Sequence, residues 1–265
     1  MALRPLLARY DQLLVDLDGC LWVGDEPVRG AADALAQLRA DGKALSFLTN
    51  DVRSAPEELV RKLWRLGFQA SLDEVVTAGA ALQFTLAGRG TPGSAFVIGT
   101  LALVEHVASA GLRIANRTEF ASRADVVVVG AHAGFDYAEL RTAVQAVVRG
   151  AELIGLSRDP TYPMPDGPWP ATGPLLAAVE AASGRRADRI IGKPEPALYE
   201  AARDRLGPGR CLAIGDRLDT DVAGARRAGI DQALVLTGAT DAEQAAAADP
   251  APTHVADSLA ALVLA

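Results

Sequence analysis

The stretch LVDLDG at residues 14–19 places two aspartates directly after a short apolar run. Residues 13–15 predict a buried strand, and the spacing of Asp16 and Asp18 points both side chains the same way on an extended chain. Gly19 then allows the chain to turn sharply. Ligands of parallel sheets bind beyond the carboxyl ends of the strands, so this acid pair predicts a site there. The alternative is an ordinary strand end followed by an Asx turn.

The chain around this strand alternates between short apolar runs and segments with helical spacing. Strands are predicted at 44–48, 75–76, 95–98, 126–129, 152–156, 211–214 and 233–236, and helices at about 31–38, 55–66, 101–110, 137–149, 220–228 and 241–249. Such alternation predicts parallel βαβ units and an α/β fold with a Rossmann-like core. A second α/β unit is predicted between roughly 80 and 185, with a Pro-rich loop at 159–168.

Two further candidate segments hold groups suited to phosphate. Thr49 and Asn50 follow the strand at 44–48, where a hydroxyl and backbone N–H groups can hold phosphate oxygens. Lys193 precedes Pro194, which favours an extended backbone at the lysine, and its compact charge suits phosphate. The alternatives are an ordinary Thr/Asn turn and a solvated loop lysine.

A last acidic segment follows the strand at 211–214. Asp216 comes directly after Gly215 and is the best placed of these acids to reach the same cation as the first pair. Asp221 falls at the start of the next helix, where it can hold a metal-bound water or orient Lys193. The acid and threonine at 219–220 have the alternative role of capping that helix.

The acids at these strand ends favour a hard cation. Neighbouring carboxylates repel each other and any phosphate unless a cation lies between them, and oxygen ligands suit Mg²⁺. The histidines, His106, His132 and His254, lie far apart and have no cysteine near them, which disfavours a zinc site of His/Cys type.

The composition of the 265 residues excludes several classes of protein. The 26 Lys and Arg residues against 33 Asp and Glu residues give a net charge of −7, which argues against a nucleic-acid-binding surface. No apolar stretch approaches the roughly 18 residues of a membrane span. Two cysteines cannot form a disulfide scaffold, and the first ten residues hold too short an apolar run for a signal peptide. The expected location is the cytoplasm.

The four motifs, in this order, resemble those of the haloacid dehalogenase (HAD) superfamily of phosphohydrolases. They stand as Asp16-Leu17-Asp18-Gly19, Thr49-Asn50, Lys193-Pro194 and Gly215-Asp216 with Asp221. An insertion between the second and third motifs resembles class II of that superfamily. Three segments are similar to its IIA subgroup of p-nitrophenylphosphatase-like, phosphoglycolate and glycerol-phosphate phosphatases: Leu21-Trp22-Val23-Gly24, Gly134-Phe135-Asp136-Tyr137 and Asp159-Pro160-Thr161-Tyr162-Pro163.

The resemblance implies a HAD core at 1–79 plus 186–265 and an inserted C2-type cap domain at 80–185. It implies hydrolysis of a small phosphorylated metabolite through an aspartyl-phosphate on Asp16, with Asp18 as general acid and base. Caps of this type often form dimers in the family, which extends the expectation to a homodimer.

The resemblance also implies the ligand and substrate contacts. Mg²⁺ is held by the Asp16 carboxylate, the Asp18 backbone carbonyl and Asp216. Phosphate oxygens are held by Thr49, the backbone of Asn50 and Lys193, with Asp221 supporting them from behind. In the cap, Arg158 and Asp159 are the candidates for substrate selection, with a plain surface arginine as the alternative for the former.

Three positions depart from the family pattern. Cys20 stands where threonine is usual, Asp51 where a second asparagine is usual, and Ser157 begins a cap motif that usually starts with asparagine. The first two motivate an alternative hypothesis, a weak or inactive binding or regulatory protein of the same fold. A phosphate-accepting receiver module is a third hypothesis, which the length and the insertion disfavour.

Overall fold

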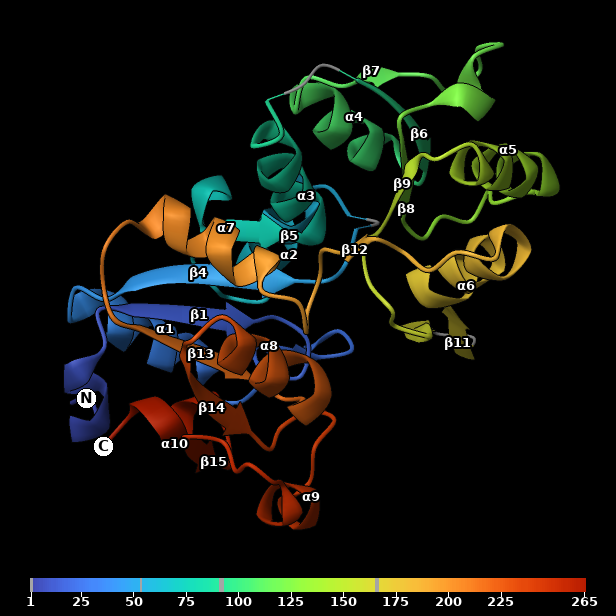
Figure 1. Cartoon of the computed structure of the whole chain (residues 1–265). Helices are drawn as coiled ribbons and strands as arrows, with labels where there is room; N and C mark the ends of the chain where they lie inside the picture. The colour runs from blue at the N-terminus through green and yellow to red at the C-terminus, as the bar shows by residue number, and fades with distance from the viewer. Residues whose placement is uncertain (1, 53, 91–92, 165–166) are drawn as a thin grey trace. The chain divides into compact units, whose positions relative to one another are not determined.

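The computed structural model describes residues 2–52, 54–90, 93–164 and 167–265. The chain forms two compact units (Figure 1). The first unit comprises Met1–Thr49, Pro56–Val76 and Lys193–Ala265, and the second comprises Asn50–Ala55 and Thr77–Gly192. Each unit has a parallel sheet with helices on both faces, so the predicted α/β fold class is confirmed.

The first unit is organised around β1, the strand predicted from LVDLDG. Its sheet has the order β15-β14-β13-β1-β4-β5. The strands are β1 (Gln12–Asp16), β4 (Ala44–Thr49), β5 (Val75–Thr77), β13 (Cys211–Gly215), β14 (Asp231–Val235) and β15 (His254–Ala256). β1 pairs in parallel with β4 on one side and β13 on the other, and all five of its residues are buried because helices cover both faces of the sheet.

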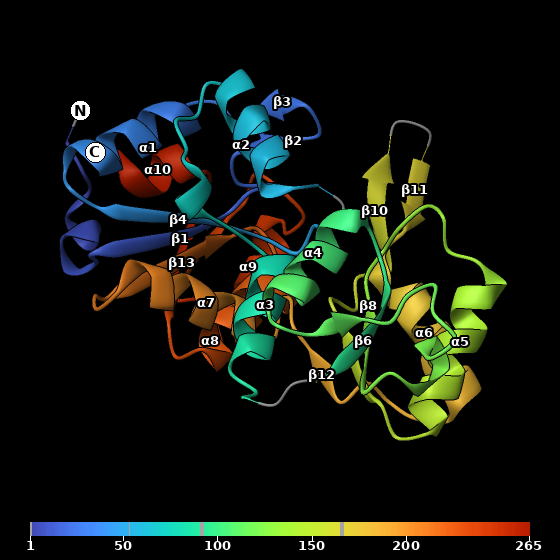
Figure 2. The ribbon, with the colours of Figure 1, turned by 90° about the horizontal axis from the view of Figure 1, so that it is seen from above.

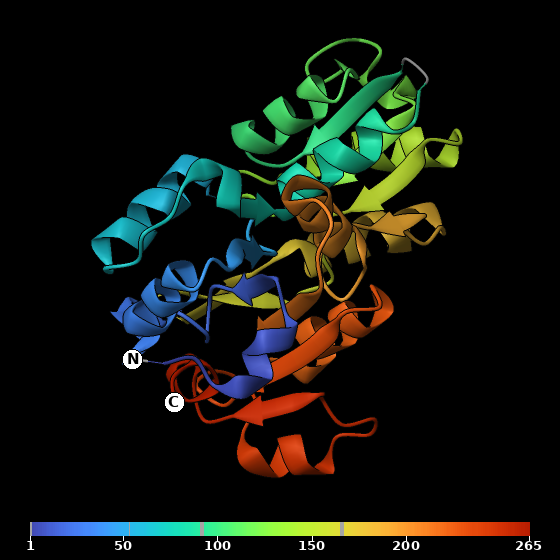
Figure 3. The same cartoon turned by 90° about the vertical axis from the view of Figure 1, so that its left-hand side faces the viewer.

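Helices cover both faces of this sheet. The helices are α1 (Ala31–Ala40), α2 (Pro56–Arg65), α7 (Ala197–Leu206), α8 (Ala223–Arg227), α9 (Ala242–Ala247) and α10 (Leu259–Val263), with short turns η1 (Pro5–Arg9), η2 (Leu72–Glu74) and η4 (Leu218–Val222). Figure 2 shows α1 and α10 on one face and α7 and α8 on the other. The two ends of the chain lie side by side (Figure 3), and the Arg4 N–H donates to the Val263 carbonyl at 2.9 Å.

The strand order creates the place for a site. From β1 the chain adds β4 and β5 on one side, and it later returns to add β13, β14 and β15 on the other. Such a reversal leaves a crevice outside the carboxyl ends of the central strands, because the connecting segments diverge there. β1, β4 and β13 end at Asp16, Thr49 and Gly215, so the predicted motifs meet at this edge.

The second unit repeats this construction with a five-stranded parallel sheet, in the order β12-β9-β8-β6-β7. The strands are β6 (Ser94–Ile98), β7 (Arg113–Ile114), β8 (Val126–Val129), β9 (Glu152–Gly155) and β12 (Arg189–Ile190). The helices are α3 (Ala78–Ala87), α4 (Leu101–Ser109), α5 (Tyr137–Val148) and α6 (Thr172–Ser183), with the turn η3 (Ala121–Arg123). Its own apolar core lies between the sheet and the pair α5 and α6.

Two predicted elements were wrong in part. The stretch 159–168, predicted as a loop, contains most of an antiparallel hairpin of β10 (Thr161–Met164) and β11 (Gly167–Pro170). Tyr162 and Trp169 are paired across it with ring centroids 6.4 Å apart, and a two-stranded ribbon tolerates proline at its edges. The helix predicted at 220–228 starts as the π-turn η4 and becomes α-helical only at α8.

A small hairpin follows the first motif, made of β2 (Trp22–Val23) and β3 (Glu26–Pro27). Among the described residues, no helix is long and apolar enough to cross a bilayer. Cys20 and Cys211 are both buried free thiols.

Candidate functional site

The centre of the site is a buried lysine between two buried aspartates. Lys193 Nζ donates to Asp16 Oδ1 and, at 2.6 Å, to Asp221 Oδ1. The three side chains are each at most about a tenth exposed. The structure therefore brings together a strand-end acid, the lysine before Pro194 and the acid of η4. The contact favours the orienting role for Asp221 over the role of holding a water.

Burial and charge set the protonation of this group. Burial raises the pKa of Asp16 well above its ordinary value, although the Lys193 charge acts in the opposite direction. Burial lowers the pKa of Lys193, but the charges of Asp16 and Asp221 outweigh it and hold that pKa well above normal. The lysine is therefore a permanent cation at the carboxyl end of β1.

Asp216 is held by the loop that follows β14. Its Oδ2 accepts the Ala239 N–H at 2.6 Å, and its backbone carbonyl accepts the Thr240 N–H at 3.2 Å. Two glycines enclose the carboxylate: a Cβ on Gly19 would lie 2.3 Å from Oδ2, and one on Gly238 would lie 2.0 Å from it. Gly19 also has φ of +77°, so glycine is required there for both conformation and space.

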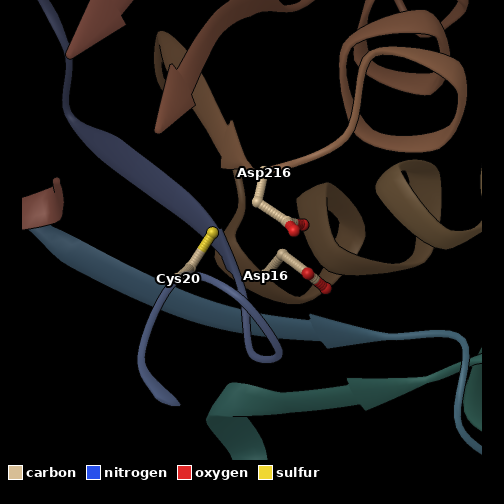
Figure 4. A group of neighbouring side chains, drawn as sticks. All are labelled: Asp16, Cys20 and Asp216. Atoms are coloured by element: carbon tan, nitrogen blue, oxygen red, sulfur yellow. The ribbon is translucent and has the colours of Figure 1, made fainter. Parts of the chain in front are cut away.

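The donor set fits a hard cation. The ligand atoms of Asp16, Asp216 and Cys20 lie within 4.8 Å of one another. Figure 4 shows the two carboxylates extending in the same direction, with the sulfur of Cys20 on the other side. Burial raises the pKa of the Asp216 carboxyl, and a buried acid pair of this kind is stabilised when a cation neutralises it. Two carboxylate oxygens without a thiolate suit Mg²⁺.

Cys20, one of the departures from the family pattern, is fully buried beside these acids. Burial raises the pKa of its thiol well above normal, and the Asp16 charge adds to this effect. A protonated thiol is a small apolar group with a weak donor, so the residue fills space without competing for the cation.

Asp18, the second acid of the pair, has a different environment. It is exposed, and its Oδ1 accepts the Trp22 indole N–H at 2.8 Å. The sequence pattern does not distinguish the two acids, but in the structure Asp16 is buried and Asp18 is exposed.

The second motif divides between the two units. Thr49 ends β4 in the first unit and is buried. Asn50 begins the second unit, where its side-chain amide donates to Asp159 Oδ2 at 3.0 Å. A Cβ on Gly192 would lie 2.4 Å from the Asn50 Oδ1, so the asparagine is closely packed in that unit.

Arg158 is engaged by an acid of α6. Its guanidinium donates to both oxygens of Glu180, at 2.8 and 3.3 Å, and Arg186 binds the same carboxylate at 3.0 Å. The Glu180 side chain is 4% exposed, whereas that of Arg158 is 48% exposed. The hydrogen bonds from Arg158 lower the pKa of Glu180 from 4.5 to about 2.

This cluster predicts an acid-dependent contribution to stability. Because the folded-state pKa is lowered, the contribution is complete above the unfolded value of 4.5 and is lost as the pH falls toward about 2. Glu180→Gln should lower the free energy of unfolding by about 1–2 kcal/mol at neutral pH and by little near pH 2, allowing for the exposure of the arginines. Denaturant unfolding at several pH values checks this; an equal loss at all pH values would contradict it.

Several residues of the site were missed by the sequence analysis. The sequence indicates Trp22 only as part of a family motif, and no pattern in it points to residues 237–240. Thr237 Oγ1 donates to the Gly19 carbonyl, and the Tyr199 hydroxyl donates to the Asp221 carbonyl at 3.0 Å. The one available signal was position, since residues 237–240 follow β14 at the same edge of the sheet as the predicted motifs.

Two family profiles match the chain. Residues 13–113 match the profile of the haloacid dehalogenase-like hydrolases, and residues 190–262 match that of the HAD-hydrolase-like proteins. The matches fall on segments that carry the acid, threonine and lysine motifs.

Individual proteins are similar over almost the whole chain. D-glycerol 3-phosphate phosphatase of Mycobacterium tuberculosis is 36% identical over 98% of this chain and 73% of its own length. Human chronophin is 38% identical over 96% of this chain and 90% of its own length.

Solved structures agree with these sequence relatives. The crystal structure of 4-nitrophenylphosphatase from Thermotoga maritima is 30% identical, with a TM-score of 0.89 over 98% of both chains. The structure of glycerol phosphate phosphatase from Mycobacterium tuberculosis in complex with magnesium is 38% identical, with a TM-score of 0.89 over 97% of this chain and 77% of that one.

Proposed function

Because the chain belongs to the haloacid dehalogenase-like hydrolases, we propose that it is a Mg²⁺-dependent phosphatase of small phosphomonoesters. The observation that carries the proposal is the buried group of Asp16, Lys193, Asp221 and Asp216 at the reversal point of the sheet. It combines a nucleophile, a fixed cation and oxygen donors for a metal. The relatives carry names of glycerol phosphate, sugar and 4-nitrophenyl phosphatases, which supports a small substrate.

The first step is attack by an Asp16 oxygen on phosphorus. The bond from phosphorus to the ester oxygen breaks, and Asp18 gives its proton to that oxygen. Asp18 then takes a proton from the water that hydrolyses the aspartyl-phosphate. Exposure suits Asp18 to this exchange, and burial suits Asp16 to a reaction that excludes bulk water.

The remaining core residues hold the phosphate. Lys193 stays charged and neutralises the oxygens of the transferring phosphoryl group. Asp221 keeps the Lys193 ammonium directed at Asp16. Thr49 and the backbone of Asn50 complete the contacts to phosphate. Asp16, the Asp18 carbonyl and Asp216 would hold Mg²⁺, which supplies positive charge against the repulsion between the nucleophile and the phosphate dianion.

We propose that the inserted domain, predicted at 80–185 with the core at 1–79 and 186–265, caps the site and selects the leaving group. The second unit of the structure runs further along the chain, to Gly192, because β12 belongs to its sheet. Arg158 and Asp159 are its candidate selecting residues; each already has a partner inside the second unit. We also propose a cytoplasmic location and a homodimer formed through the cap. The two matched family profiles are those of HAD-type hydrolases and not of receiver modules.

The experiment that tests the function is phosphate release from a panel of esters with Mg²⁺ and with a chelator. The panel contains glycerol 3-phosphate, phosphoglycolate, pyridoxal phosphate, a sugar phosphate and p-nitrophenyl phosphate. We expect turnover of at least one ester that depends on Mg²⁺. No release from any ester would contradict the proposal and favour the binding or regulatory alternative.

A further inference from the structure

The turn between Asp18 and Trp22 is closed by two hydrogen bonds. The indole Nε1 donates to Asp18 Oδ1 at 2.8 Å, and the Gly19 N–H donates to the Trp22 carbonyl at 2.7 Å. Trp22 is 1% exposed and packs against Phe68, with ring centroids 6.4 Å apart. A buried, immobile ring therefore holds an exposed carboxylate.

An exposed acid needs such a partner to act at a fixed position. A free aspartate side chain samples several rotamers, and a proton donor acts only when it lies within hydrogen-bond distance of the accepting oxygen. The indole N–H is a donor only, so it binds Asp18 Oδ1 whether the carboxyl is ionised or protonated. This occupies one oxygen and leaves Oδ2 to carry the proton.

A cation lies on the ring that makes this bond. Lys62 Nζ of α2 is 4.5 Å from the centroid of the Trp22 ring, and it also approaches the Gly24 carbonyl at 3.4 Å. An ammonium over an indole face is attracted by the ring and withdraws electron density from it, which strengthens the N–H as a donor. The same lysine attaches the β2–β3 turn to α2, so the ring is fixed from two sides.

We propose that Trp22, supported by Lys62, is a positioning residue that fixes Asp18 so that Oδ2 gives its proton to the leaving oxygen. The proposal rests on the proposed phosphatase function. Oδ2–H transfers its proton as the phosphorus–oxygen bond breaks, and the resulting carboxylate later accepts a proton from water. Loss of the indole N–H should therefore damage protonation of the leaving group and leave phosphate binding intact.

The dependence of kcat/KM on the leaving group distinguishes this role from simple structural support. An alkoxide is strongly basic and needs the proton, whereas p-nitrophenolate is a stable anion and leaves without it. We expect Trp22→Phe, which keeps the ring and loses the N–H, to lower kcat/KM about tenfold for the best alkyl phosphate of the panel. For p-nitrophenyl phosphate we expect a change of less than about twofold.

The decisive readout is kcat/KM for the alkyl phosphate divided by kcat/KM for p-nitrophenyl phosphate. This ratio does not depend on the fraction of folded protein, and Trp22→Phe should lower it. Trp64→Phe is the matched control because it also removes an indole hydrogen bond of 2.8 Å, to the Ala70 carbonyl. It should leave the ratio unchanged. Lys62→Met should lower the ratio by about threefold, as Trp22→Phe does to a larger extent.

A ratio in Trp22→Phe equal to that of the unmodified chain would overturn the proposal, whether both substrates slow together or neither does. In an Asp18→Asn background, Trp22→Phe should add no further loss for the alkyl ester; an additional tenfold loss would also overturn it. Failure of the unmodified chain to turn over any ester would instead refute the phosphatase function and this inference with it.

Discussion

Asp16→Asn is expected to reduce turnover of every ester by about 10⁴-fold or more, because an amide cannot form the aspartyl-phosphate. The substitution keeps the shape of the side chain at the end of β1. Thermal unfolding in the absence of Mg²⁺ should show no loss of stability, since burial already opposes the charge on Asp16.

The matched control lies at the opposite end of the same strand. Asp11, directly before β1, accepts the Arg210 N–H at 2.8 Å and is exposed. Asp11→Asn should leave kcat within about twofold. Equal activity of the Asp16 variant and the unmodified chain would contradict the assignment of the nucleophile.

Lys193→Met is expected to have the second-largest effect. The lysine is buried between Asp16 and Asp221, so its loss removes the cation that faces the phosphate and leaves two buried carboxylates unpaired. We expect kcat/KM to fall about 10³-fold and the free energy of unfolding to fall by about 3 kcal/mol. Steady-state kinetics and denaturant unfolding measure the two effects.

Two further variants separate catalysis from stability. Lys43→Met is the control, because Lys43 donates to the Tyr10 carbonyl away from the site; it should change the free energy of unfolding by less than about 1 kcal/mol. Adding Asp221→Asn to Lys193→Met should recover part of the stability and none of the activity. Recovery of activity in that double variant would show that the lysine has only a structural role.

The part of the site that depends on strand ends could be predicted from the sequence. An apolar run followed by an acid indicates where a strand ends and which residue lies at that end. Because β1 and β4 pair in parallel, Asp16 and Thr49 then lie at the same edge of the sheet. Asp216 follows the apolar run of β13 in the same way. The α/β class follows because local periodicity determines it.

The contacts that complete the site were beyond this reasoning because they depend on packing between distant segments. Nothing local shows that Gly238 makes room for Asp216, or that the Ala239 N–H binds it. The partner of Asp18 lies four residues away, but the bond depends on how Trp22 packs against Phe68. The hairpin at β10 and β11 was missed because proline suppresses the usual strand pattern.

The most direct test of the central claim is chemical trapping of the intermediate during turnover. Borohydride reduces an aspartyl-phosphate to homoserine, so the chain is quenched with borohydride while it hydrolyses an alkyl phosphate with Mg²⁺, and its peptides are sequenced by mass spectrometry. We expect homoserine at position 16, dependent on substrate and absent in Asp16→Asn. Sustained turnover with unmodified aspartate at position 16, or with homoserine at another position, would contradict it.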